Sequence, residues 1–252
     1  MSYIEGFIAP VSASGREAYE HHARAFAAIA PELGIKRMVE GWADDVPRGK
    51  LTDFYRAVAA NEEETVVFSW FEYPSRKERD AANEKFRTDP RMNDLMGKVP
   101  FDAKRMIFGG FETILDSGKG PGGYVSGFIA PVPRERKDAY REMNERQAPI
   151  FQEHGALRFV QAWADDVPEG QVTDFRRAVR AEQSEDVVLA FIEWPSKQAN
   201  LEGWDRIMKD ERMQHTGEPP FDGKRLFWGG FEVIVDTARS QLAAATAAPI
   251  TA

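Results

Sequence analysis

The chain has 252 residues, 42% of them hydrophobic, with no cysteine and a formal net charge of −8. The absence of cysteine excludes disulfide bonds, a thiolate nucleophile and Cys-ligated metal centres, and the acidic balance argues against nucleic acid or anionic lipid as the main partner. The N-terminus lacks the basic and apolar segments of a signal peptide, and no stretch reaches the ~18 apolar residues of a membrane span. We therefore predict a folded cytoplasmic protein that binds neither nucleic acid nor a membrane.

One motif dominates the sequence because it is written twice. It runs from Trp42 to Val58 with the pattern Trp-Ala-Asp-Asp-Val-Pro-x-Gly-x-x-Thr-Asp-Phe-x-Arg-Ala-Val, and it returns 121 positions later, from Trp163 to Val179, without an insertion. A copy of this length identifies the repeat unit as a whole domain. The predicted organisation is a first repeat over residues 1–116, a Gly-rich linker over 117–123, a second repeat over 124–237 and an Ala-rich tail over 238–252.

The first half of each repeat has the pattern of a strand, a helix and a second strand. Residues 3–10 are rich in aromatic and β-branched residues, as strands are. Ser14 begins a capping box, which predicts a helix start, and the apolar stripe of that helix ends before Gly34. Residues 35–43 form the second predicted strand, and the Asp-Asp-Val-Pro segment after it is interpreted as a turn.

The second half of each repeat is predicted to hold two more strands around a helix. Residues 52–59 fit either a short strand or a helical turn capped by Thr52, and we predict the extended form. Residues 65–73 are almost continuously apolar, as expected of a strand that is covered on both faces. A capping box at Ser75 opens a helix to Thr88, and residues 104–116 close the repeat as a strand.

This order of elements predicts an α+β fold made of two ferredoxin-like βαββαβ repeats. Such a repeat has both helices on one face of a mainly antiparallel sheet, and its other face cannot stay in water when its strands are this apolar. Two repeats that pack sheet to sheet would cover both faces, as two subunits do in a homodimer. We therefore expect a monomer that acts as a fused dimer, with further dimerisation left open.

The repeated motifs resemble those of the YbaA-like family of uncharacterised bacterial proteins. Besides the motif from Trp42, they are Tyr-x-x-Gly-Phe-x-x-Pro-Val and Pro-Phe-Asp-x-Lys-Arg-x-x-x-Gly-Gly-Phe-Glu, and together they cover nearly the whole of each half. The resemblance implies the dimeric α/β-barrel superfold, here closed within one chain. It implies no particular reaction, because proteins of this superfold carry out several.

Glu72 and its copy Glu193 are the candidate catalytic residues. Each lies at the end of an apolar strand, where burial would raise the pKa of a carboxyl group and suit it to general acid or base catalysis. The alternatives are an ion pair with Lys104, Arg105 or Arg56, or a strand end that reaches solvent.

The candidate ligand-binding residues are aromatic and polar groups that occur in both copies. Trp42 and Trp163, with the pair Tyr73 and Trp194, are placed to line a cavity between the halves, although aromatic residues in strands more often belong to the core. The polar candidates are Asp53, Asp174, Arg56 and Arg177. Maintenance of the fold explains their repetition as well as ligand binding does.

No metal or cofactor site is predicted. The Gly-rich linker lacks the Gly-Lys-Ser/Thr ending of a phosphate-binding loop. His21 and His22 are adjacent and diverge on a helix, and no histidine has a partner at metal-ligand spacing.

The sequence thus predicts a small-molecule binding protein or a cofactor-independent enzyme with a pocket between the two repeats. The alternative is a structural or interaction protein with a filled interface and no catalytic activity. The two copies differ at Phe26 and Gln147 and at Asn83 and Trp204, which indicates that one of two equivalent sites has changed.

Overall fold

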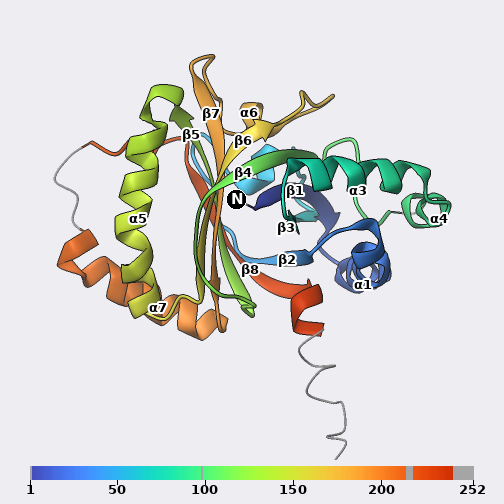
Figure 1. Ribbon diagram of the computed structural model, residues 1–252, viewed down its shortest axis with the longest axis horizontal. Helices are drawn as coiled ribbons and strands as arrows, with labels where there is room; N and C mark the ends of the chain where they lie inside the picture. Colours follow the sequence, from blue (N-terminus) through green and yellow to red (C-terminus); the bar gives the residue numbers. More distant parts are fainter. Residues whose placement is uncertain (1, 98, 214–217, 241–252) are drawn as a thin grey trace, which may run out of the picture.

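The two repeats close one β-barrel within a single chain in this computed structural model, which describes residues 2–97, 99–213 and 218–240. Its eight strands follow the order β1-β3-β2-β8-β5-β7-β6-β4, and all neighbouring strands are antiparallel. Figure 1 shows the barrel between two groups of helices, one from each repeat.

The strands of the two repeats correspond one to one along the barrel, and so do the main helices between them. In the first repeat they are β1 (Tyr3–Ser12), α1 (Arg16–Leu33), β2 (Arg37–Asp45), α2 (Phe54–Ala57), β3 (Glu64–Tyr73), α3 (Arg76–Thr88), α4 (Arg91–Met96) and β4 (Ile107–Gly118). In the second they are β5 (Tyr124–Pro133), η1 (Arg134–Arg136), α5 (Lys137–Glu153), β6 (Arg158–Asp166), α6 (Phe175–Ala178), β7 (Glu185–Trp194), α7 (Lys197–Lys209), η2 (Glu211–Met213) and β8 (Phe227–Asp236). Each repeat alone has the strand order β4-β1-β3-β2 or its equivalent, which is the ferredoxin-like order.

Two seams join the repeats edge to edge. Strand β2 pairs with β8, and β4 pairs with β6, so neither repeat keeps a free sheet edge in the barrel. The register shifts twice along each seam, at matching places, as it commonly does at the bulges where a barrel bends. The fused dimer expected from the duplication is therefore one continuous sheet.

Large apolar side chains fill the interior of the barrel. The rings of Trp70 and Phe191, from different repeats, stack with their centroids 4.1 Å apart, and both residues are fully buried. Phe54 of α2 and Phe175 of α6 belong to the same buried cluster. The prediction of a ligand pocket between the repeats is wrong for this region, because close-packed aromatic residues occupy the space.

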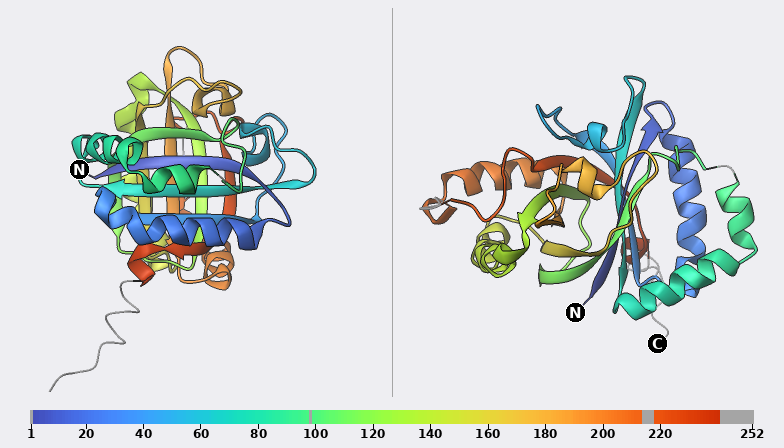
Figure 2. Two further views of the ribbon diagram at one scale, coloured as in Figure 1. Left: turned by 90° about the vertical axis from the view of Figure 1, so that its right-hand side faces the viewer. Right: turned by 90° about the horizontal axis from the view of Figure 1, so that it is seen from above.

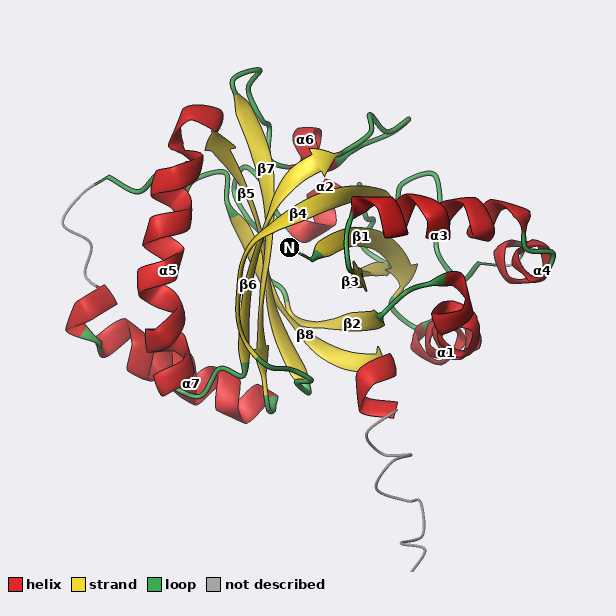
Figure 3. Ribbon diagram, in the orientation of Figure 1, coloured by secondary structure: helices red, strands yellow, loops and turns green. Residues whose placement is uncertain are grey.

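The helices lie on the outside of the barrel. Helices α1, α3 and α4 cover the outer face of the first repeat, and α5 and α7 cover that of the second (Figures 2 and 3). Each repeat thus has a second apolar layer between sheet and helices, separate from the barrel interior. None of the helices in the described ranges combines the length and apolar character that a bilayer crossing requires.

Residues 52–59 do not form the extended segment that we predicted. They contain the helical turn α2, which begins after Asp53, and the Asp53 carboxylate accepts a hydrogen bond from the backbone N–H of Arg56 at 2.7 Å. An aspartate in extended conformation that satisfies an N–H three residues later is a helix N-cap. Thr52 is not the cap, and its hydroxyl instead donates to the carbonyl of Arg225.

Two smaller predictions also need correction. Helix α1 has Gly15 at its N-cap position without a side-chain cap, and the Ser14 hydroxyl contacts that of Ser12 instead of a backbone N–H. Asp44 and Asp45 belong to the end of β2, not to a turn. The Ala-rich tail predicted over 238–252 lies outside the described residues from 241 onward.

Candidate functional site

A cavity with a mostly apolar wall lies in the first repeat, between the outer face of its sheet and helices α1 and α3. Its volume is about 320 Å³, within the range of small-molecule sites. Most of its wall is aromatic and aliphatic, including Phe7, Phe26, Phe71 and Phe101. The polar groups on the wall are Glu5, Tyr19, His22, Glu40, Ser69, Tyr73, Asn83 and Arg87.

Glu40 is the most deeply buried acid on this wall. It lies on β2, where its Oε2 accepts hydrogen bonds from the Tyr19 hydroxyl at 2.6 Å and from the Ser69 hydroxyl. Burial raises the pKa of Glu40 to about 7, although both hydrogen bonds favour the ionised form. Its Oε1 has no hydrogen-bond partner among the described residues, so this oxygen is available to a bound molecule.

Glu5 lies on β1 and is the second acid of the cavity. Its carboxylate accepts hydrogen bonds from Asn83 Nδ2 at 3.0 Å and from the Tyr73 hydroxyl at 3.3 Å, and Arg79 Nη1 lies 3.5 Å from its Oε1. Burial raises the pKa of Glu5, and these three polar neighbours only partly oppose that rise.

Strand register places the two acids on one face. Glu5 is opposite Phe71 and Glu40 is opposite Ser69 on the central strand β3, so both side chains point to the helix-covered side. Both carboxyl groups have raised pKa values, and Glu40, with a pKa of about 7, can take up and release a proton near neutral pH.

A histidine adds a further titratable group to the cavity wall. Burial, together with the neighbouring His21, lowers the pKa of His22, which lines the cavity. No group of three or more His, Cys, Asp or Glu side chains within residues 2–97, 99–213 and 218–240 is arranged to hold a metal ion.

The second repeat has a smaller cavity at the equivalent place, with a volume of about 200 Å³. Gln161 stands where Glu40 stands, and it accepts a hydrogen bond from the Tyr140 hydroxyl at 2.6 Å, as Glu40 does from Tyr19. Ala190 replaces Ser69, and Ser126 replaces Glu5. No carboxylate lines this second cavity among the residues that the structure describes.

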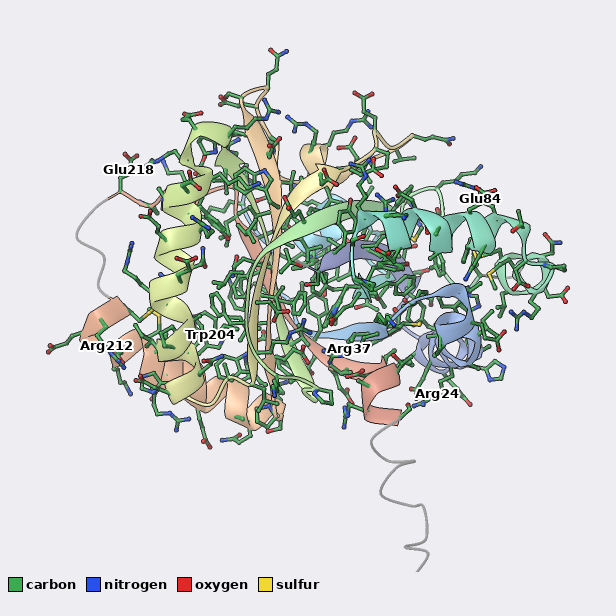
Figure 4. All side chains as sticks on the ribbon, in the orientation of Figure 1. Arg24, Arg37, Glu84, Trp204, Arg212 and Glu218 are labelled. Atoms are coloured by element: carbon green, nitrogen blue, oxygen red, sulfur yellow. The ribbon has the colours of Figure 1, made fainter. Side chains whose placement is uncertain are left out.

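Tryptophan side chains take up part of the space in the second repeat. Trp204, which replaces Asn83, lies between the helices and the sheet (Figure 4), and its ring packs edge to face on Phe151 with centroids 5.2 Å apart. Ser126 Oγ lies 3.1 Å from the indole nitrogen of Trp194, which replaces Tyr73. The differences at positions 83 and 204 therefore mark a real divergence of the two sites.

Glu72 and Glu193 do not face either cavity. They meet at one end of the barrel in an ionic cluster with two arginines and two aspartates: Arg37, Arg158, Asp116 and Asp236. Arg37 donates to both oxygens of Glu193 at 2.8 and 2.7 Å, and Arg158 donates to both oxygens of Glu72 at 2.7 and 3.1 Å.

The raised pKa expected for Glu193 is wrong. Burial acts in that direction, but the hydrogen bonds and charge of Arg37, with the charge of Arg158 and the N–H of Gly122, hold the pKa of Glu193 below its usual range. The ion-pair alternative describes the arrangement, although the partners are not the Lys104, Arg105 or Arg56 named for it. The catalytic role of Glu72 and Glu193 remains a prediction that this geometry does not favour.

The predicted ligand-binding residues lie at separate places. Trp42 packs against Tyr19 with ring centroids 6.0 Å apart, and the Trp163 indole donates to Asp186 at 3.1 Å; both tryptophans are buried. Asp53 and Asp174 cap the short helices α2 and α6 and pair with Arg56 and Arg177, whose side chains are about half exposed. The structure gives these six residues packing and capping contacts and does not gather them into one site.

The sequence analysis missed Glu5 and Glu40 because it considered polar residues that both copies share. Both acids occur in the first copy only; the equivalent positions of the second copy hold Ser126 and Gln161. The signal that would have found them is an acid in one copy that is replaced by a neutral polar residue in the other, within otherwise matching strands.

The architecture defines the class: a dimeric α/β-barrel protein whose two ferredoxin-like units are fused in one chain. The chain belongs to the family described as "Protein of unknown function (DUF1428)", whose model matches residues 2–103 and again 123–223. The Uncharacterized protein YbaA of Escherichia coli strain K12 is 55% identical over 114 residues, which cover 45% of this chain and 97% of that protein. That relative therefore corresponds in length to one repeat.

Solved structures support the fold. One from Lactobacillus acidophilus, described as a "putative monooxygenase", has a TM-score of 0.57 at 9% identity and covers 94% of this chain and 96% of its own. Another with the same description, from Fusobacterium nucleatum, has a TM-score of 0.56 at 8% identity and covers 93% of both chains. At such identities the likeness concerns the fold alone.

Proposed function

We propose that the chain binds a small, largely apolar molecule in the cavity of the first repeat and that Glu40 exchanges a proton with it, without a cofactor. The observation that carries this proposal is a buried carboxyl group on an apolar cavity of about 320 Å³; its pKa is about 7, and one of its oxygens has no hydrogen-bond partner in the described part of the chain. Leaving a carboxylate in such surroundings costs stability, so its presence needs a use.

The cavity wall favours a particular kind of ligand. Aromatic side chains offer flat faces for a ring. Oε1 of Glu40, when ionised, accepts a hydrogen bond, and when protonated it can donate one. A neutral molecule with one ring and a weakly acidic O–H, N–H or C–H group near its polar end matches this wall.

Binding is tested first by native mass spectrometry of the gently purified full chain, followed by the same sample after denaturation. A mass excess that disappears on denaturation identifies a retained ligand. In parallel, N-phenyl-1-naphthylamine, an apolar amine whose fluorescence rises in apolar sites, is titrated into the protein. We expect enhanced fluorescence that saturates. The proposal would be overturned if no ligand were retained and the probe fluorescence showed no saturable increase.

Proton transfer is tested by incubating the retained ligand with the protein in D2O. General base catalysis by Glu40 would exchange a carbon-bound hydrogen for deuterium, and mass spectrometry would record the gain. We expect exchange with the unaltered chain and none with Glu40→Gln, which keeps the shape and the Tyr19 hydrogen bond, as Gln161 does in the second repeat. Equal exchange with both proteins would exclude Glu40 as the base.

A binding protein without chemistry is the second candidate. It is favoured by the filled barrel interior, because the cavity that can hold a ligand then lies within one repeat, away from the interface between the repeats. Retention of a ligand without deuterium exchange would select this function.

A further inference from the structure

Arg79 connects the cavity of the first repeat to the second repeat. It lies on α3 with 6% of its surface exposed. One terminal nitrogen, Nη1, is 3.5 Å from Oε1 of Glu5, and the other, Nη2, is 2.5 Å from Oδ2 of Asp166. Asp166 is the last residue of β6, so an acid from one repeat contacts the arginine that faces the cavity acid of the other.

The strand register explains how one side chain reaches both acids. Glu5 on β1 lies opposite Gly110 on β4, and Gly110 lies opposite Asp166 on β6. A Cβ atom at Gly110 would collide with the Tyr3 hydroxyl and approach Nη2 of Arg79 to 2.8 Å. The missing side chain therefore leaves room for the guanidinium to pass across β4.

Asp165 supports the same arrangement from the second repeat. Its Oδ2 accepts hydrogen bonds from the Tyr3 hydroxyl and from Arg76 Nη1, both at 2.9 Å. Tyr3 in turn accepts a hydrogen bond from Arg79 Nη2 at 3.1 Å. Asp165 and Asp166 of the second repeat thus bind helix α3 and its arginine, which belong to the first repeat.

The equivalent seam on the other side of the barrel lacks this connection. Asn200 stands in place of Arg79, and Ser126 in place of Glu5. Asp44, the counterpart of Asp165, keeps the equivalent contacts: it accepts a hydrogen bond from the Tyr124 hydroxyl at 3.0 Å and pairs with Lys197 at 2.7 Å. The arginine and the cavity acid are therefore absent together from the repeat whose cavity has no carboxylate.

We infer that Asp166 is a positioning residue for the site of the first repeat, because it holds the Arg79 guanidinium beside Glu5. The inference rests on the proposed function, which gives Glu5 its place on the ligand cavity. The site is then built from both repeats, and fusion in one chain keeps the second repeat's acid in register with it.

The acidity of Glu5 reports this role with a definite sign. The groups around Glu5 are Tyr73 from β3, Arg79 and Asn83 from α3, and Asp166 from β6, while Glu40 lines the same cavity. Removing the negative charge of Asp166 would by itself lower the pKa of Glu5. If Asp166 also holds Arg79 in place, its removal lets the cation move away, and the pKa of Glu5 rises instead.

The experiment is an NMR titration of the full chain with 13C-labelled glutamate carboxyl groups, in which Glu5→Gln identifies the Glu5 signal. In Asp166→Asn we expect the Glu5 midpoint to move to higher pH. The matched control is Asp45→Asn, the counterpart in the first repeat, which should leave the midpoint unchanged. An unchanged or lower midpoint in Asp166→Asn would overturn the inference.

A second variant separates the positioning of Arg79 from a general disturbance of the structure by the Asp166→Asn substitution. With Arg79→Gln already present, adding Asp166→Asn should no longer raise the Glu5 midpoint, because no cation remains to be positioned; a further rise would contradict the inference. Asp166 has 42% of its side chain exposed, so asparagine is sterically acceptable there. The titration needs no ligand, so a failure to bind N-phenyl-1-naphthylamine would defeat the proposed function and leave this result standing.

Discussion

The two repeats share a scaffold and differ at the two outer cavities. At the barrel end, equivalent residues of both repeats form one nearly symmetric ionic cluster, in which Arg37 and Arg158 hold Glu193 and Glu72. At the outer cavities, the positions of Glu5 and Glu40 in the first repeat are occupied by Ser126 and Gln161 in the second. Both copies therefore keep the charged residues at the barrel end, whereas among the described residues only the first copy has carboxyl groups on its outer cavity.

The symmetric cluster should respond alike to equivalent substitutions, and this is the largest effect we expect. Glu193→Gln removes one of the two carboxylates that bind the buried Arg37 bidentately, the other being Asp236, and this should cost about 3 kcal/mol of unfolding free energy at pH 7. Glu72→Gln should cost a similar amount through Arg158. Because the pKa of Glu193 is lowered in the fold, its stabilisation is present above its ordinary pKa and is lost as the pH falls. Urea unfolding at pH 7 measures both, and a cost at only one position would break the symmetry.

Replacement of Glu40, an acid that the second repeat lacks, should change stability in the direction opposite to replacement of Glu193 or Glu72. The pKa of Glu40 is about 7 in the folded state against an ordinary 4.5. Its ionisation therefore costs no stability below pH 4.5, and the cost grows as the pH rises until it passes about 7. Glu40→Gln should therefore stabilise the fold by about 3 kcal/mol at pH 8 and by almost nothing at pH 4.5.

The matched control for Glu40→Gln is Gln161→Glu, which places an acid at the same position of the second repeat. It should destabilise the protein at pH 8 and be nearly neutral at pH 4.5, as followed by urea unfolding at both values. A pH-independent difference for Glu40→Gln would mean that Glu40 is not desolvated.

The pair Asn83 and Trp204 sharpens the comparison of packing. Trp204→Ala removes a ring from the second helix–sheet layer and should cost about 2 kcal/mol, below the usual figure for a buried tryptophan because the residue is only partly buried. Asn83→Ala removes one hydrogen bond to Glu5 and should cost about 1 kcal/mol. Chemical denaturation compares the two, and equal costs would mean that position 204 does not fill space.

The last expected effect concerns binding of the fluorescent probe. Asn83→Trp copies the second repeat and should narrow the first cavity, so that N-phenyl-1-naphthylamine binds about tenfold more weakly, or ~1.4 kcal/mol. Glu84→Trp is the control, since Glu84 is the next residue of α3 and its side chain is 65% exposed (Figure 4). Fluorescence titration measures both variants; unchanged affinity for Asn83→Trp would place the probe elsewhere.

Several features followed from the sequence itself. The doubled motif, the strand and helix periodicities and the apolar run of β3 determined two ferredoxin-like units fused as a dimeric barrel, because local patterns record which faces are buried. The differences between copies at Phe26 and Asn83 also indicated that the sites had diverged. Short segments were less certain, and the turn at Asp53 was assigned to the wrong conformation because four residues carry too little periodicity to decide.

Tertiary structure alone decided where chemistry can occur. The sequence marked Glu193 as an acid in an apolar strand, but only the barrel brings Arg37 and Arg158 to it from strands far along the chain. The same register turns Glu5 and Glu40 onto one cavity and brings Asp166 of the other repeat to Arg79. The pKa of a buried carboxyl group depends on the charges and solvent around it, and those neighbours can be far away in the sequence, as Arg37 and Glu193 are, 156 positions apart.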